Sequence, residues 1–73
     1  MGSTGSETSE LRRAWVEQLT PDRFSVFEGD RRIGFIDVDW PLHVALRGAD
    51  YETAVEIDRA IRFDQALRAV LGD

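Results

Sequence analysis

The sequence predicts a small single domain of the α+β class, in which helices pack on a central antiparallel β-hairpin. Two amphipathic segments, residues 9–19 and 51–71, carry apolar residues at helical spacing. Between them, residues 24–27 and 32–40 have the aromatic and β-branched content of strands. The predicted layout is therefore an N-terminal helix, a hairpin, and a C-terminal helix or helix pair.

Length and composition limit the architecture. The chain has 73 residues and no cysteine, so we expect one domain without disulfide bonds. We assign residues 10–73 to this domain and residues 1–9, which read MGSTGSETS, to a flexible polar tail. The tail lacks the basic and apolar regions of a signal peptide, and we expect a cytoplasmic protein.

The N-terminal helix is expected from Ser9 to Leu19. Leu11, Trp15 and Leu19 lie four residues apart and would form one apolar stripe. Pro21 would end the helix, because the residue before a proline is disfavoured in the helical region.

The hairpin prediction depends on Gly29-Asp30, which suits a two-residue type II′ turn with a positive φ at glycine. In that register Glu28 faces Arg31, which places opposite charges beside the turn. One face of the hairpin would then carry Phe24, Val26, Ile33 and Phe35. The other face would carry Phe27, Ile36, Val38 and Trp40.

If both faces of so small a hairpin are apolar, each face must be buried against another element or another molecule. We expect the chain's own helices on one side, and a helix, a second copy or a partner on the other. Gly34, in mid-strand, indicates a bulge or the close approach of another backbone. In the alternative, a bulge at Gly34 reverses the alternation of faces and leaves one face mostly in solvent.

Residues 41–48 are compatible with two structures. A short helix is the preferred interpretation, because Pro41 suits a first helical turn and Gly48 a helix end. A third strand at 42–47 is the alternative. It would require Pro41 at the third position of a tight turn, which is accommodated by a cis peptide bond.

The C-terminal helix is expected from Tyr51 to Leu71, with Gly72 as its terminator. Its apolar stripe is interrupted near Phe63, and Asp64 could begin a separate final helix. Whether the helix breaks there is left open.

Charge argues against several classes of function. The formal net charge is -5, and nine basic residues, all arginine, oppose fourteen acidic ones. Nonspecific nucleic-acid binding and adsorption to anionic membranes both depend on clustered basic residues. We therefore expect no direct nucleic-acid partner and no membrane partner.

Catalysis is not expected either. The chain has one histidine, His43, and Ser25 is the only serine outside the tail, so no nucleophilic triad is indicated. The sequence carries no phosphate-binding loop or metal-binding motif. We predict no enzyme activity, no catalytic residue, no cofactor and no metal site.

The predicted function is that of a small acidic regulatory protein that binds another protein or a second copy of itself through the hairpin face or an edge strand. Exposed aromatic and arginine side chains dominate binding hot spots. The candidate partner-binding residues are Phe27, Arg31, Arg32, Ile36, Val38 and Trp40.

An alternative function is inhibition of a nucleic-acid-processing machine such as a polymerase or nuclease. The protein would dock on the machine or imitate nucleic acid with an acidic surface. The residues of that surface are Asp37, Asp39, Asp50 and Glu52.

Overall fold

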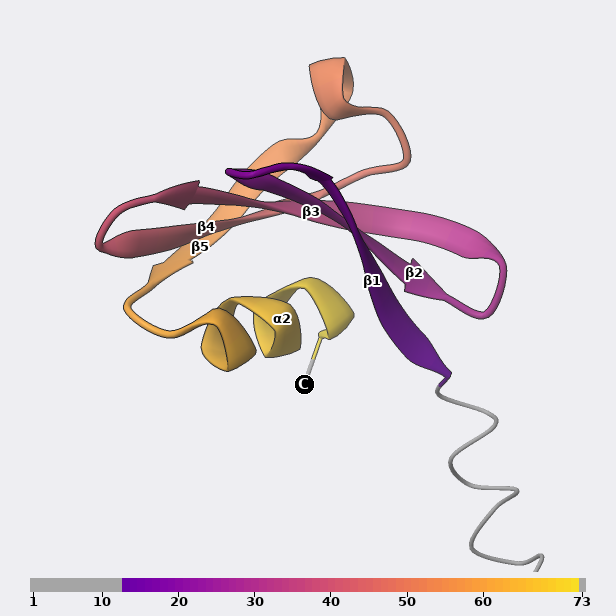
Figure 1. The fold of residues 1–73 in the computed structure, drawn as a ribbon. Coiled ribbons are helices and arrows are strands. Elements are labelled where there is room, and N and C mark those ends of the chain that lie inside the picture. The colour runs from indigo at the N-terminus through magenta and orange to yellow at the C-terminus, as the bar shows by residue number, and fades with distance from the viewer. Residues whose placement is uncertain (1–12, 73) are drawn as a thin grey trace, which may run out of the picture.

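The fold is one antiparallel sheet of five strands with a helix across one side (Figure 1). It comes from a computed structural model that describes residues 13–72. The strands follow one another as a meander, so each pairs with its neighbour in sequence. The elements are β1 (Ala14–Thr20), β2 (Arg23–Glu28), β3 (Arg31–Asp39), β4 (Leu42–Arg47), the 3₁₀ helix η1 (Tyr51–Thr53), β5 (Val55–Ala60) and α2 (Phe63–Leu71).

The predicted α+β layout of helices packed on a central hairpin is wrong, because most of residues 13–72 form a five-stranded sheet. The first difference is at the N-terminal end, where the structure has strand β1 instead of a helix. Trp15 pairs with Phe27 and Val16 with Val26 in the β1–β2 ladder. The four-residue spacing of the apolar residues suggested a helix, but Trp15 and Val16 also suit the two faces of a strand, and pairing with β2 favours the strand. The first residues of the predicted helix, 9–12, and the predicted tail, 1–9, lie outside the described residues.

The β2–β3 hairpin has the predicted turn but contains a bulge. Gly29 has a φ of +66° and Glu28 pairs with Arg31, as expected. The register then shifts between Phe27 and Val26, so that Val26 pairs with Gly34 and Ile33 is the extra residue. The shift reverses the alternation beyond the bulge, which is the alternative left open by the sequence.

The segment 42–47 is strand β4, so the preferred helix is wrong and the alternative holds. The Trp40–Pro41 peptide bond is cis, the arrangement in which proline fits the third position of a tight turn. Strand β4 pairs with β3 on one side and β5 on the other. This two-sided pairing satisfies its backbone groups in a way that an isolated turn of helix at this place would not.

The predicted long helix 51–71 is divided into three elements: η1, β5 and α2. In β5, Val55 and Ile57 alternate with charged residues, a strand pattern that the neighbouring helical pattern obscured. Helix α2 has Asp64 in its first turn, and it ends at Gly72 in the left-handed conformation expected of a helix terminator.

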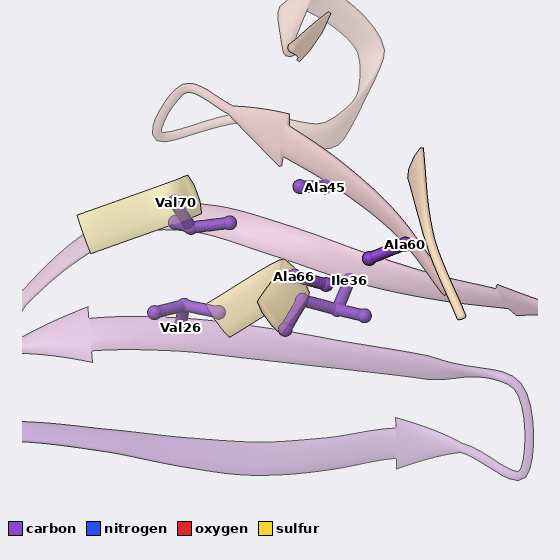
Figure 2. Packing of buried hydrophobic residues seen from close by; sticks show 6 residues of the cluster. All are labelled: Val26, Ile36, Ala45, Ala60, Ala66 and Val70. Carbon is purple, nitrogen blue, oxygen red and sulfur yellow. The ribbon is translucent and has the colours of Figure 1, made fainter. Parts of the chain in front are cut away.

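The hydrophobic core lies between α2 and one face of the sheet (Figure 2). Its buried members are Val26, Ile36, Ala45, Ala60, Ala66 and Val70. Three of them are alanines, and a Cβ placed on Gly34 would lie 2.6 Å from Val70 Cγ1. Small residues therefore let the helix lie close to the strands. The opposite face of the sheet carries η1 and not α2 (Figure 1).

Candidate functional site

The face of the sheet opposite α2, here called the open face, is partly covered by aromatic side chains. Trp15 and Phe27, which alternate with the core residues Val16 and Val26, stack with ring centroids 4.1 Å apart. Trp15 Nε1 also donates to the carbonyl oxygen of Gly29 over 2.7 Å. These contacts fix the rings at the end of the sheet where β2 turns into β3.

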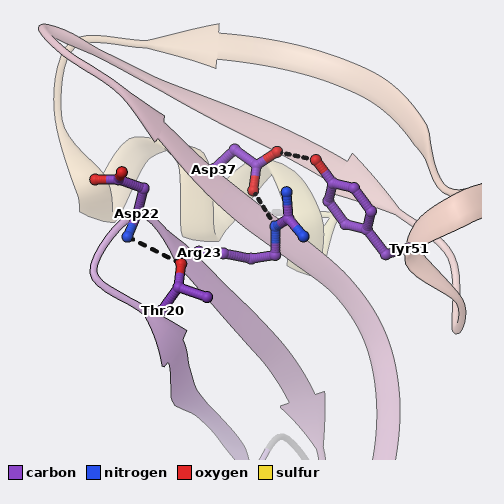
Figure 3. A network of polar contacts seen from close by, with 5 residues as sticks. All are labelled: Thr20, Asp22, Arg23, Asp37 and Tyr51. Carbon is purple, nitrogen blue, oxygen red and sulfur yellow. Dashed lines mark hydrogen bonds and ion pairs between the residues drawn. The ribbon is translucent and has the colours of Figure 1, made fainter.

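A polar network of Arg23, Asp37 and Tyr51 lies further along the open face (Figure 3). Arg23 Nε donates to Asp37 Oδ1 over 3.0 Å, and the Tyr51 hydroxyl donates to Asp37 Oδ2. The Arg23 guanidinium also lies over the Tyr51 ring, 3.6 Å from its centroid. Both carboxylate oxygens of Asp37 are thereby occupied.

The network favours fixed protonation states. The hydrogen bond to Asp37 raises the pKa of Tyr51 above its ordinary value of 10.0, and burial of the hydroxyl raises it further. The same carboxylate raises the pKa of Arg23. Tyr51 therefore stays neutral and Arg23 stays charged near pH 7, and the network holds both side chains against Asp37.

Beside this network the open face contains a cavity of about 590 Å³, here called the acidic hollow. Its lining residues are Thr20, Asp22, Arg23, Asp37, Val38, Asp39, Val44, Leu46, Tyr51 and Glu56. Four carboxylates and one arginine belong to that lining, so its charge suits a cationic group and opposes an anionic one.

The acidic hollow reaches one end of the sheet, here called the Trp40 end, where Asp22 and Asp39 line it. This end consists of the β1–β2 turn, the β3–β4 turn and the β5–α2 connection, and the last two lie together at the left of Figure 1. Pairing of His43 with Ala60 places the β3–β4 turn beside Ile61. Trp40 is 82% exposed and Ile61 71%, the two most exposed large apolar side chains in residues 13–72.

The structure brings Phe27 and Arg32 together, with the Arg32 guanidinium 5.4 Å from the centroid of the Phe27 ring, and separates this pair from the other predicted partner-binding residues. Ile36 is fully buried under α2, and Val38 is half-buried. Phe27 is half-buried against Trp15 on the open face. Arg31 and Arg32 are exposed at one end of β3, whereas Trp40 follows the other end.

Strand β3 also has no free edge, because β2 and β4 pair with its two sides. Docking along an exposed edge of this strand is therefore not possible. Of the predicted partner-binding residues, Trp40 is the one whose large apolar side chain faces mostly solvent.

The four predicted acidic-surface residues also divide. Asp37 and Asp39 line the acidic hollow, whereas Asp50 and Glu52 are exposed at η1 and do not. Sequence reasoning missed Arg23, Tyr51 and Glu56, which reach the cavity from three other elements. No local motif joins them, because their sequence positions are far apart.

The candidate catalytic groups considered from the sequence lie apart. Ser25 is fully buried and pairs with Phe35, while His43 packs edge-on against Phe63 of α2, on the other side of the sheet. Within residues 13–72, no group of three His, Asp or Glu side chains is arranged to hold a metal ion. No helix in this described range is long and apolar enough to cross a membrane.

Comparison with protein-family models, with curated proteins and with solved structures gave no significant match.

Proposed function

We propose that this protein is a non-catalytic binding module that docks on another protein through its Trp40 end. The observation that carries the proposal is the position of Trp40, whose indole is 82% exposed on a turn between two paired strands. Transfer of so large an apolar side chain from water into an interface is favourable. Tryptophan is also among the residue types that most often contribute the largest share of binding energy at protein interfaces.

The free energy available from burying the Trp40 side chain supports a role in binding. A tryptophan buries roughly 150–250 Å² in an interface, and at about 25 cal/mol/Å² that area contributes roughly 4 to 6 kcal/mol before the costs of association. Ile61, 71% exposed, directly follows β5 at the same end of the sheet and offers further apolar area. The pairing of Asp39 with Leu42 closes the turn, so little conformational freedom is lost when the turn is bound.

Charge favours a different protein over a second copy as the partner. The chain has a net charge of -5, and both Asp22 and Asp39 lie at the Trp40 end. Two copies that met through this end would bring these carboxylates together, which opposes association. We therefore assign the end to a partner whose docking surface is apolar with basic residues around it.

The test compares three forms of the full chain as baits for proteins of the source cell: wild type, Trp40→Ala, and the control Val55→Ala. Val55 is also exposed, at 63%, but lies on β5 away from the Trp40 end. A captured protein is purified and titrated against each form. Loss of a hot-spot residue raises the Kd by roughly 30-fold, so we expect this rise for Trp40→Ala and no comparable change for Val55→Ala.

Three results would contradict the proposal. One is equal affinity of all three forms for the purified partner. Another is the absence of any stoichiometric partner for the wild type. The third is a wild-type homodimer in sedimentation equilibrium that Trp40→Ala dissociates, since the proposal requires a different protein.

A further inference from the structure

We infer that a second copy of this chain pairs with the outer edge of β1, so that two sheets join into one across a two-fold axis. β2 pairs with one side of β1, and no strand within residues 13–72 pairs with the other side (Figure 1). Six of the seven residues of β1 are exposed, so its outer side is open to another chain. The contact does not use the Trp40 end, and the inference therefore goes beyond the proposed function.

The backbone groups of β1 that point outward can be assigned from one hydrogen bond. The backbone N–H of Gly29 donates to the carbonyl oxygen of Arg13 over 2.7 Å, in the same register in which Trp15 pairs with Phe27. Directly hydrogen-bonded pairs alternate along an antiparallel ladder. The N–H and C=O groups of Ala14 and Val16, which lie between such pairs, therefore point away from β2. An antiparallel second copy of β1 can bond to these groups.

Arg13 and Glu17 supply the charge complementarity. Strand alternation places both on the open face with Trp15. Neither makes an ion pair with another described residue. Four residues of strand separate them by about 13 Å, so they cannot pair within one chain. In the register that sets Trp15 opposite Trp15 of the second copy, Arg13 lies opposite Glu17 of the second copy, and the two-fold axis repeats this pair. Unlike the Trp40 end, this edge brings opposite charges together.

The same register brings the two Trp15 side chains into contact. Phe27 stacks on one face of the indole, yet Trp15 remains 45% exposed. Residues that face each other across an antiparallel pair have Cβ atoms about 4.5–5.5 Å apart, and aromatic pairs at such positions stabilise a sheet. The second copy would therefore cover part of an indole that its own chain leaves in water.

Other pairings fit less well. Centring the two-fold axis on Val16 would set Trp15 opposite Glu17 of the second copy. Centring it on Glu17 would set two carboxylates opposite each other, which is destabilising. The other edge of the sheet, β5, has a register shift between Ala45 and Leu46 in its ladder with β4, and a bulge at an edge strand opposes the addition of a further strand.

Sedimentation equilibrium of the full chain over a range of concentrations measures the association. The contact is small for a protein interface, so we expect a weak, reversible dimer. Glu17→Arg and Arg13→Glu each replace two ion pairs by two like-charge pairs, and each should weaken the dimer by roughly tenfold or more. Glu52→Arg makes the same change of charge at an exposed position in η1, and it should leave the dimer unchanged.

A mixture of the two charge variants provides the decisive comparison. A chain with Glu17→Arg offers two arginines and a chain with Arg13→Glu offers two glutamates, so a heterodimer regains both ion pairs. We expect the equimolar mixture to associate roughly tenfold more tightly than either variant alone. Ala14→Pro should also weaken the wild-type dimer, because it removes an outward N–H and leaves the ladder with β2 intact. Amide NMR spectra check that each variant is folded.

A wild type that stays monomeric at every concentration would overturn the inference. So would a dimer that Glu17→Arg leaves intact, a mixture that associates no better than its components, or a dimer that Trp40→Ala dissociates. Capture of a different protein through the Trp40 end neither requires nor prevents pairing at β1. The proposed function and this inference can therefore fail separately.

Discussion

Gly34→Ala tests whether close packing of the helix against the sheet limits the stability of this fold. A Cβ at residue 34 would lie 2.3 Å from the carbonyl oxygen of Leu46 and 2.6 Å from Val70 Cγ1. Carbon and oxygen atoms in close contact between strands are normally about 3.3–3.6 Å apart. The added methyl group would therefore have to push the β4 backbone away by about 1 Å and move the Val70 side chain as well.

The expected cost follows from overpacking. Insertion of one methyl group into a close-packed core costs about 1–3 kcal/mol. Part of this is offset, because alanine loses less conformational freedom than glycine on folding, by roughly 0.5–1 kcal/mol. The Leu46 oxygen belongs to a strand that is paired on both sides, so it cannot yield easily. We expect an overpacking cost in the upper part of that range, which leaves a net loss of about 2 kcal/mol after the offset.

Thermal unfolding followed by circular dichroism measures this loss. In a domain of this size each kcal/mol lowers the Tm by roughly 4–8 °C. Val70→Ala is combined with Gly34→Ala as a double variant, because it removes Val70 Cγ1, one of the two groups that the added Cβ would contact. We expect the double variant to be less destabilised than the sum of the single variants, by about 0.5 kcal/mol or more. A Tm for Gly34→Ala equal to that of the wild type, or strict additivity with Val70→Ala, would refute the reasoning.

Two further predictions concern Tyr51 and Gly29. Because the hydrogen bond to Asp37 raises the pKa of Tyr51, the associated stability is present below pH 10 and is lost as the pH rises through the folded-state pKa. Tyr51 is the chain's one tyrosine, so an ultraviolet titration should show its pKa fall toward 10.0 in Asp37→Asn, and an unchanged midpoint would contradict the network. Gly29→Ala should lower the free energy of unfolding by about 1–2 kcal/mol. The cost comes from the φ of +66° alone, because nothing lies within 4 Å of an added Cβ. Denaturant unfolding measures this loss, and an unchanged unfolding midpoint would count against the turn geometry.

The hairpin was predictable because its information is local. Gly29-Asp30 selects the turn, and Glu28 and Arg31 pair across it as expected. Gly34 also indicated a bulge or a close backbone approach, and both occur there. A short stretch of chain contains everything needed for these inferences.

The edge strands were not predictable from periodicity. In β1, apolar residues four apart also satisfy a strand, and in β5 the alternating residues run directly into the helical pattern of α2. Such segments become strands when a neighbouring strand offers its backbone groups. That neighbour is a property of the whole fold, and no single segment encodes it.

The candidate site was predictable only in part. The exposure of Trp40 was anticipated, and Asp37 and Asp39 were recognised as neighbouring carboxylates. The acidic hollow also needs Tyr51 and Glu56, which approach from segments beyond β4. Their convergence depends on the strand register, and the bulge at residue 33 already alters that register by one position.

The meander topology affects the order in which the elements can fold during synthesis. Each strand finds its partner next to it in the sequence, so the whole sheet can assemble as the chain leaves the ribosome. The helix that shields Val26 and Ile36 is the last described element, residues 63–71. Until those residues emerge, the sheet is formed but its apolar side is bare. The nascent chain is thus most vulnerable to aggregation just before residues 63–71 emerge.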